Sequence, residues 1–208
     1  WDHPERIAVK GPCAYDGMLA SMTYEELDHR ANQLANHLTD SGIGKGDHVA
    51  ILLEPSLEWM VSMLAILKTG GAYLPVSPEE PSERLAWILK DTAAKLVITR
   101  HAFKDKLHEG LEMVVLDAEE SAIGSAPEVP PSRAIAPEDR FYLISTSGST
   151  GQTKAVCGRH ISVLNLLADF EKRAPLPDTA PGTWWTNATF DVSVYEIWSS
   201  LLYGRTLN

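Results

Sequence analysis

The residues with the clearest capacity for chemistry lie in one segment, 145–154, which reads Ser-Thr-Ser-Gly-Ser-Thr-Gly-Gln-Thr-Lys. Its hydroxyl groups are hydrogen-bond donors, and its glycines let the backbone approach a ligand closely. Successive backbone N–H groups in such a loop form a nest for an anion. Lys154 adds a mobile positive charge. The composition therefore predicts a loop that binds the phosphate groups of a nucleotide.

This loop is not a Walker A motif, which places Gly-Lys-Ser/Thr after four residues that follow a first glycine. Here Thr153 precedes Lys154 and Ala155 follows it. An ordinary P-loop kinase or GTPase is therefore disfavoured. A flexible Ser/Gly linker is the alternative. Linkers rarely follow an apolar strand-like run such as 141–144 directly, and the binding loop is the preferred interpretation.

Strand-like and helix-like patterns alternate through the first part of the chain. Thr23 and Glu26 form a capping box, and apolar residues then recur at helical spacing. The sequence predicts helices that begin at Thr23, Ser56 and Ser82, and extended segments at 48–53, 74–76, 95–99 and 113–116. Such alternation is typical of an α/β fold, with a mixed or parallel sheet flanked by helices.

A proline-rich stretch at 118–139 interrupts this alternation and is predicted to be a connecting loop. It divides the chain into a first α/β subdomain, 1–139, and the start of a second, 140–208, which carries the phosphate loop. The predicted elements of the second part are strands at 141–144 and 183–186 and helices near 161–170 and 192–203.

The phosphate loop resembles the signature loop of the adenylate-forming superfamily, Tyr-Thr-Ser-Gly-Ser/Thr-Thr-Gly-x-Pro-Lys-Gly. Segments 22–27, 67–76 and 190–193 resemble three further motifs of that superfamily, in the same order. Together they span nearly the whole chain. The amino-acid sequences of 67–76 and 190–193 are most similar to the corresponding motifs in adenylation domains of nonribosomal peptide synthetases. The resemblance implies the N-terminal part of the adenylate-forming enzyme fold.

The resemblance also implies roles for individual residues. Asp191 would bind the α-ammonium group of an amino acid, with helix capping as its structural alternative. Val192 and Tyr195 would line the side-chain pocket, although Tyr195 is equally compatible with a core position. Phe190 is expected to pack rather than to contact a ligand. The residues implied in binding the ATP phosphates are Thr146, Ser147, Gly148, Ser149, Thr150, Gly151 and Lys154.

The implied reaction is ATP-dependent activation of an amino acid as aminoacyl-AMP, with release of pyrophosphate. The acyl group then passes as a thioester to phosphopantetheine on a peptidyl carrier protein. ATP with Mg²⁺ is the implied cofactor, and the implied partners are the carrier protein and neighbouring synthetase domains. A fragment of an acyl- or aryl-CoA ligase and a non-catalytic scaffold fragment are the alternatives.

The chain departs from the family pattern in two ways. Thr153, Ala155 and Ser77 stand where proline, glycine and aspartate are usual. The later family motifs, including a catalytic lysine in a C-terminal domain, do not occur before the last residue, Asn208. We therefore assign no catalytic residue in this chain and expect it to be nearly inactive by itself.

Composition excludes several other classes. The chain has 208 residues, 44% of them hydrophobic, and a formal net charge of −10. No basic stripe favours nucleic-acid binding, and no apolar run is long enough to predict a membrane span or a signal peptide. Its two cysteines lie far apart, which favours a reducing, cytoplasmic setting. No spacing of His, Cys or carboxylates predicts a metal site. Trp184, Trp185 and His160 are expected to be structural.

Overall fold

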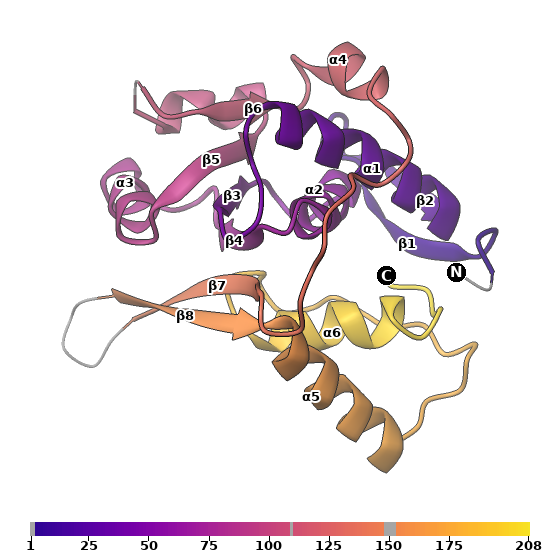
Figure 1. Cartoon of the computed structure of the whole chain (residues 1–208). Coiled ribbons are helices and arrows are strands. Elements are labelled where there is room, and N and C mark those ends of the chain that lie inside the picture. Colours follow the sequence, from indigo (N-terminus) through magenta and orange to yellow (C-terminus); the bar gives the residue numbers. More distant parts are fainter. Residues whose placement is uncertain (1–2, 109, 148–152) are drawn as a thin grey trace.

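The structure is a computed structural model that describes residues 3–108, 110–147 and 153–208. These residues form a six-stranded sheet of order β6-β5-β3-β4-β7-β8 and a separate two-stranded sheet, β1-β2 (Figure 1). The strands are β1 Ile7–Pro12, β2 Leu19–Thr23, β3 His48–Leu52, β4 Ala72–Val76, β5 Ala94–Thr99, β6 Met113–Val115, β7 Arg140–Ser147 and β8 Thr153–Arg159. The helices are α1 Tyr24–Asp40, α2 Leu57–Lys68, α3 Ser82–Asp91, α4 Glu120–Gly124, α5 His160–Arg173 and α6 Val192–Leu201, with a 3₁₀ turn at His101–Lys106.

The large sheet is mixed. Strands β3, β4, β5 and β6 are parallel to their neighbours, whereas β7 and β8 form an antiparallel hairpin. Strand β7 joins the parallel part of the sheet through one register pair with β4, Tyr142 opposite Tyr73. The predicted fold class is confirmed. The division into subdomains at 139/140 stays a prediction, and in Figure 1 this point lies at the start of β7.

Local sequence signals explain where the first helices begin. The Thr23 hydroxyl accepts a hydrogen bond from the Glu26 N–H at 3.2 Å, and the Glu26 carboxylate accepts one from the Thr23 N–H at 2.8 Å. This reciprocal cap is the capping box that the sequence predicts. Helix α2 begins in a similar way, because the Ser56 hydroxyl accepts from the Trp59 N–H at 3.2 Å.

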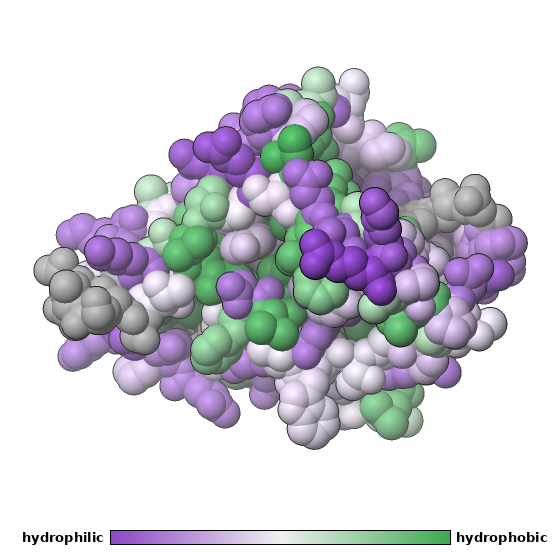
Figure 2. Space-filling view, turned by 90° about the horizontal axis from the view of Figure 1, so that it is seen from below, coloured by the Kyte–Doolittle hydropathy of each residue, from purple (hydrophilic) through white to green (hydrophobic). Residues whose placement is uncertain are grey.

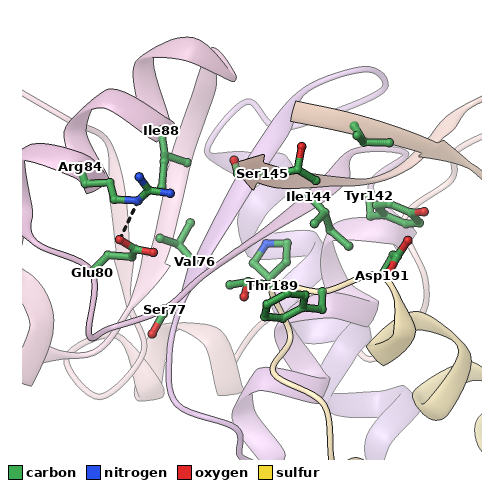
Figure 3. Close-up of a pocket in the computed structure, with 14 residues that line it drawn as sticks. Val76, Ser77, Glu80, Arg84, Ile88, Tyr142, Ile144, Ser145, Thr189 and Asp191 are labelled. Atoms are coloured by element: carbon green, nitrogen blue, oxygen red, sulfur yellow. Dashed lines mark ion pairs between the residues drawn. The ribbon is translucent and has the colours of Figure 1, made fainter. Parts of the chain in front are cut away.

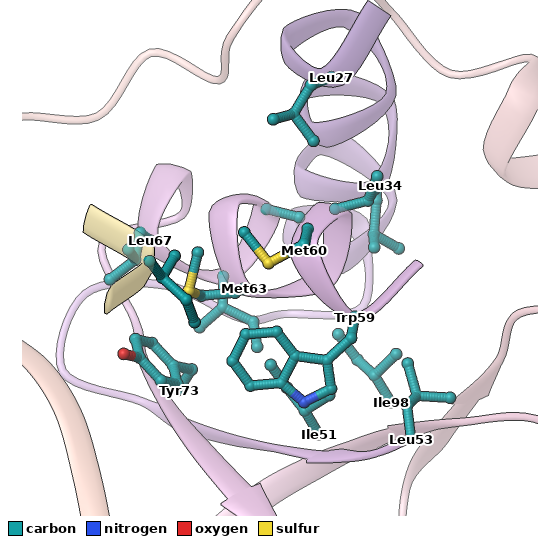
Figure 4. Close-up of a cluster of buried hydrophobic side chains, with 14 of the residues drawn as sticks. Leu27, Leu34, Ile51, Leu53, Trp59, Met60, Met63, Leu67, Tyr73 and Ile98 are labelled. Atoms are coloured by element: carbon teal, nitrogen blue, oxygen red, sulfur yellow. The ribbon is translucent and has the colours of Figure 1, made fainter. Parts of the chain in front are cut away.

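The core lies between α2 and the sheet. Nearly every residue of α2 is buried, since α1 packs on one side of it and β-strands on the other. Figure 4 shows Trp59 of α2 above Ile51, with the ring of Tyr73 beside it. The rings of Trp59 and Tyr73 meet edge to face, with centroids 6.1 Å apart. This core anchors β4, the strand that borders the hairpin.

The strand predicted at 183–186 does not form. The backbone N–H groups of Trp185 and Thr186 are bound by the Glu196 carboxylate, at 3.1 and 2.8 Å, rather than by a neighbouring strand. Trp184 packs on Trp59, with ring centroids 4.7 Å apart, whereas Trp185 is 88% exposed. The core interpretation is therefore right for Trp184 and wrong for Trp185.

Helix α5 is apolar on more than its inner face. Val163 and Leu167 are buried, while Ile161, Leu164 and Phe170 are exposed. Figure 2 views the molecule from the side on which α5 lies and shows hydrophobic patches among polar ones. Exposed apolar surface of this kind is typical of a contact face. None of the helices in the described ranges has the length and hydropathy needed for a membrane span.

Candidate functional site

The predicted phosphate loop connects the two strands of the β7–β8 hairpin. Segment 148–152, which includes Gly148, Ser149, Thr150 and Gly151, lies outside the described residues. The backbone of Ser147 is opposite that of Thr153, and Thr146 is opposite Lys154. The Thr146 hydroxyl donates to the Lys154 carbonyl at 3.1 Å, and Lys154 is exposed. The hairpin therefore holds Thr146 and Lys154 together at the base of the loop.

The departures at the end of the signature loop do not strain the backbone. Ala155 lies within β8, in register with Ser145 of β7. Ala93 is the one non-glycine residue with a positive φ in the described part of the chain. Ala155 thus occupies an ordinary strand conformation, and glycine is not required there.

A cavity of about 380 Å³ lies beside β7, where the end of β4 approaches the segment that leads into α6 (Figure 3). Because β4 and β7 are parallel neighbours, residues at their carboxyl ends meet at one edge of the sheet. The cavity brings together Thr146 and Asp191, which the sequence predicts from separate motifs. Its lining residues are Pro75, Val76, Ser77, Glu80, Arg84, Ile88, Tyr142, Ile144, Ser145, Thr146, Val156, Thr189, Phe190 and Asp191.

Asp191 occupies the N-cap position of α6, but its side chain makes no capping hydrogen bond. Its carboxylate instead lies at the cavity wall, near the ring of Tyr142 (Figure 3). Burial, followed by the negative charge of Asp191, raises the pKa of the Tyr142 hydroxyl. This end of the cavity therefore combines a carboxylate with a neutral phenol.

The opposite wall of the cavity carries an ion pair. Arg84, in the first turn of α3, places its Nε 3.0 Å from Oε2 of Glu80, which lies just before the helix (Figure 3). Arg84 is the one cationic side chain among the described lining residues. Ser77, which stands where the family often has aspartate, lines the same wall and offers Arg84 no second carboxylate.

Sequence reasoning did not identify Tyr142, Glu80 or Arg84 as site residues. The alternation of side chains along a strand supplies a signal for Tyr142, because Tyr142, Ile144 and Thr146 recur at every second position. All three line the cavity. No comparable local signal points to Arg84, which reaches the cavity only because α3 follows β4.

The cavity does not include every predicted residue. Val192 is 54% exposed and Tyr195 packs on Phe170 with ring centroids 4.7 Å apart; neither is among the described lining residues. Phe190, expected to serve in packing, is 62% exposed and lines the cavity. His160 packs edge to face on Phe141 at 4.8 Å, and burial lowers its pKa. Within the described ranges, no group of three or more His, Cys, Asp or Glu side chains could hold a metal ion.

Comparisons with known proteins show which family the chain belongs to. The family model described as AMP-binding enzyme matches residues 2–208. Tyrocidine synthase 2 of Brevibacillus parabrevis is 38% identical over 204 residues, which cover 98% of this chain and 6% of that protein.

Solved structures of adenylate-forming proteins also match nearly the whole chain. The nonribosomal peptide synthetase FmoA3, bound to alpha-methyl-L-serine-AMP, matches with a TM-score of 0.87 and 29% identity, over 99% of this chain and 22% of that one. The N-terminal subdomain of Klebsiella oxytoca NpsA, in complex with 3-hydroxybenzoyl-AMSN, has a TM-score of 0.81 and 25% identity, over 98% and 49% of the two chains. The chain therefore spans a minor part of each of these proteins.

Proposed function

Because the chain belongs to the AMP-binding enzyme family, we propose that it forms part of an ATP-dependent enzyme that activates an amino acid as aminoacyl-AMP. The observation that carries this proposal is the shared cavity of Thr146, beside the phosphate loop, and Asp191, at the start of α6. One cavity thus offers donors for phosphate oxygens and a carboxylate for an ammonium group.

The chemistry requires an amino-acid carboxylate in line with the α-phosphate of ATP, and donors that stabilise the charge on the departing pyrophosphate. The hairpin would supply those donors at the loop, and Lys154 would add the counter-charge. Mg²⁺ bound with ATP would neutralise further phosphate charge. The proposed phosphate-binding residues are Thr146, Ser147, Gly148, Ser149, Thr150, Gly151 and Lys154.

The substrate side of the proposal rests on Asp191. An amino acid brings an ammonium group that pairs with a carboxylate, whereas a 3-hydroxybenzoyl group, as named for the NpsA complex, has none. Asp191 therefore favours an amino acid over an aryl or acyl acid. We also propose that Val192 and Tyr195 line the pocket for the side chain of the amino acid. Other parts of the full-length protein would complete that pocket.

The proposed partners follow from the peptide synthetase relatives. The activated acyl group would pass to the phosphopantetheine thiol of a carrier protein beside neighbouring synthetase domains. The requirement for ATP and two cysteines that form no disulfide fit a cytoplasmic location.

The test is amino-acid-dependent exchange of labelled pyrophosphate into ATP, screened over amino acids with the full-length protein that carries this sequence. We expect exchange with one or a few amino acids, and an Asp191→Asn variant that loses at least about tenfold in kcat/KM for the amino acid. Asp40→Asn, at the exposed end of α1 and not among the described lining residues, is the matched control. Exchange with desamino acids but not amino acids would favour the aryl- or acyl-acid alternative. A folded protein without any exchange would favour a scaffold.

A further inference from the structure

Asp191 is not the only hydrogen-bond acceptor at its end of the cavity. In Figure 3 the hydroxyl end of Tyr142 and the carboxylate of Asp191 lie next to each other at one end of the cavity. Both side chains line the cavity. Burial and then the charge of Asp191 raise the pKa of the Tyr142 hydroxyl, so the phenol beside this carboxylate stays neutral.

The position of the Tyr142 ring is fixed by its neighbours. Tyr142 is opposite Gly158 in the β7–β8 register, and a Cβ added at Gly158 would collide with Cε1 of the Tyr142 ring. The ring therefore lies directly over the Gly158 backbone. Tyr73 and Phe141 contact it at centroid distances of 6.2 and 6.3 Å. A ring held in this way presents its hydroxyl at a set place on the cavity wall.

The charge distribution of the cavity selects the kind of group that this corner would bind. Its one described cation, Arg84, is on the opposite wall and already pairs with Glu80 (Figure 3). Asp191 has no described ion-pair partner, and a neutral phenol offers oxygen lone pairs. An ammonium group, with three donors and one positive charge, complements both.

We infer that Tyr142 is a second ammonium-binding residue, whose hydroxyl oxygen accepts one N–H of the amino acid while Asp191 accepts the others. This inference rests on the proposed function and adds a residue to it. The phenol would increase the preference for an amino acid over the same acid without its amine, because the desamino substrate leaves both the phenol and the carboxylate without the ammonium donors that they accept.

The test is the ratio of kcat/KM for the amino acid to kcat/KM for its desamino analogue, measured by pyrophosphate exchange in the full-length protein. Tyr142→Phe keeps the ring over Gly158 and removes only the hydroxyl. We expect the ratio to fall about tenfold to a hundredfold, as for a lost hydrogen bond to a charged group, with an unchanged KM for ATP. Tyr203→Phe is the matched control, since it keeps the ring that lies 5.1 Å from the Arg205 guanidinium and Tyr203 is not among the described lining residues.

The possible outcomes are distinct. An unchanged ratio in Tyr142→Phe overturns the inference, and so does an equal loss with both substrates, which would indicate a purely structural phenol. Absence of amino-acid-dependent exchange in the unmodified protein overturns the proposed function itself, before any variant is compared. A selective fall in Tyr142→Phe, with Tyr203→Phe unchanged, supports the subsite.

Discussion

The guanidinium of Arg205 and the carboxylate of Glu171 form a bidentate ion pair, with N–O distances of 2.9 and 2.5 Å. Arg205 is only 2% exposed and also donates to the Leu176 and Ser199 carbonyls. The pair ties the last turn of α5 to the segment after α6. It thereby fixes α6, which carries Asp191 at its start.

This pair predicts an acid-sensitive contribution to stability. The hydrogen bond from Arg205 lowers the pKa of Glu171. The carboxylate thus stabilises the fold above its unfolded pKa, about 4.3, and this contribution is lost as the pH falls through the lower folded value. We expect Glu171→Gln to lower the free energy of unfolding by about 2 kcal/mol at pH 7, and the difference from the unmodified protein to shrink at pH 3. Urea unfolding at pH 7 and pH 3 measures this difference in the free energy of unfolding.

Asp169→Asn is the control for this experiment, because Asp169 pairs with Arg173 in an exposed ion pair one turn apart on the same helix. Its effect is expected to stay within about 0.5 kcal/mol. A difference between Glu171→Gln and the unmodified protein that does not change with pH would contradict the assignment.

Gly158 is predicted to be intolerant of any side chain. The added Cβ of Gly158→Ala would collide with the Tyr142 ring, and overpacking of this kind costs about 1–3 kcal/mol. Thermal unfolding and the KM for the amino acid should both report the displaced ring. Gly44→Ala is the control, since a Cβ added there would have no atom within 4 Å and the φ of Gly44 is not positive. Equal stabilities of the two variants would show that the ring moves aside without cost.

Ala93 is predicted to be a site of stabilisation. It follows the C-cap of α3 with φ of 48°, in the left-handed region that costs an L-residue about 1–2 kcal/mol. Ala93→Gly relieves that cost but gains unfolded-state entropy worth about 0.5–1 kcal/mol, so we expect a net gain of up to about 1 kcal/mol. The neighbouring Ala94→Gly, within β5, should instead destabilise. A lower melting temperature for Ala93→Gly would refute the strain argument.

Lys154 is predicted to matter for turnover and not for folding. Its exposed side chain in β8 makes no described ion pair, so Lys154→Ala should leave the free energy of unfolding within about 0.5 kcal/mol. Loss of a charge that stabilises the leaving pyrophosphate should lower the exchange rate about a hundredfold. Lys172→Ala, also exposed, is the control. An exchange rate in Lys154→Ala equal to that of the control would contradict the proposed role of Lys154 in phosphate binding.

The elements that sequence predicted best are those decided within a few residues. The helix starts at Thr23 and Ser56 and the apolar spacing of α1 follow from neighbouring side chains, and the structure confirms them. The strand expected at 183–186 failed because Glu196, ten residues away, takes the backbone donors that a strand partner would have used. Strand β8 was not predicted, since it is mostly exposed and lacks an alternating apolar pattern.

The sequence by itself determined the α/β class, the position of the loop proposed to bind phosphate and the presence of Asp191 before the last helix. Each of these depends on residue type and short-range order. Only the tertiary structure decided which of these residues share a cavity. Pairing of β4 with β7 brings Ser77 and Arg84 to the same cavity as Asp191, which is far from both in the chain. It also placed Tyr142 over Gly158, because a contact across the β7–β8 hairpin depends on the register in which the two strands pair.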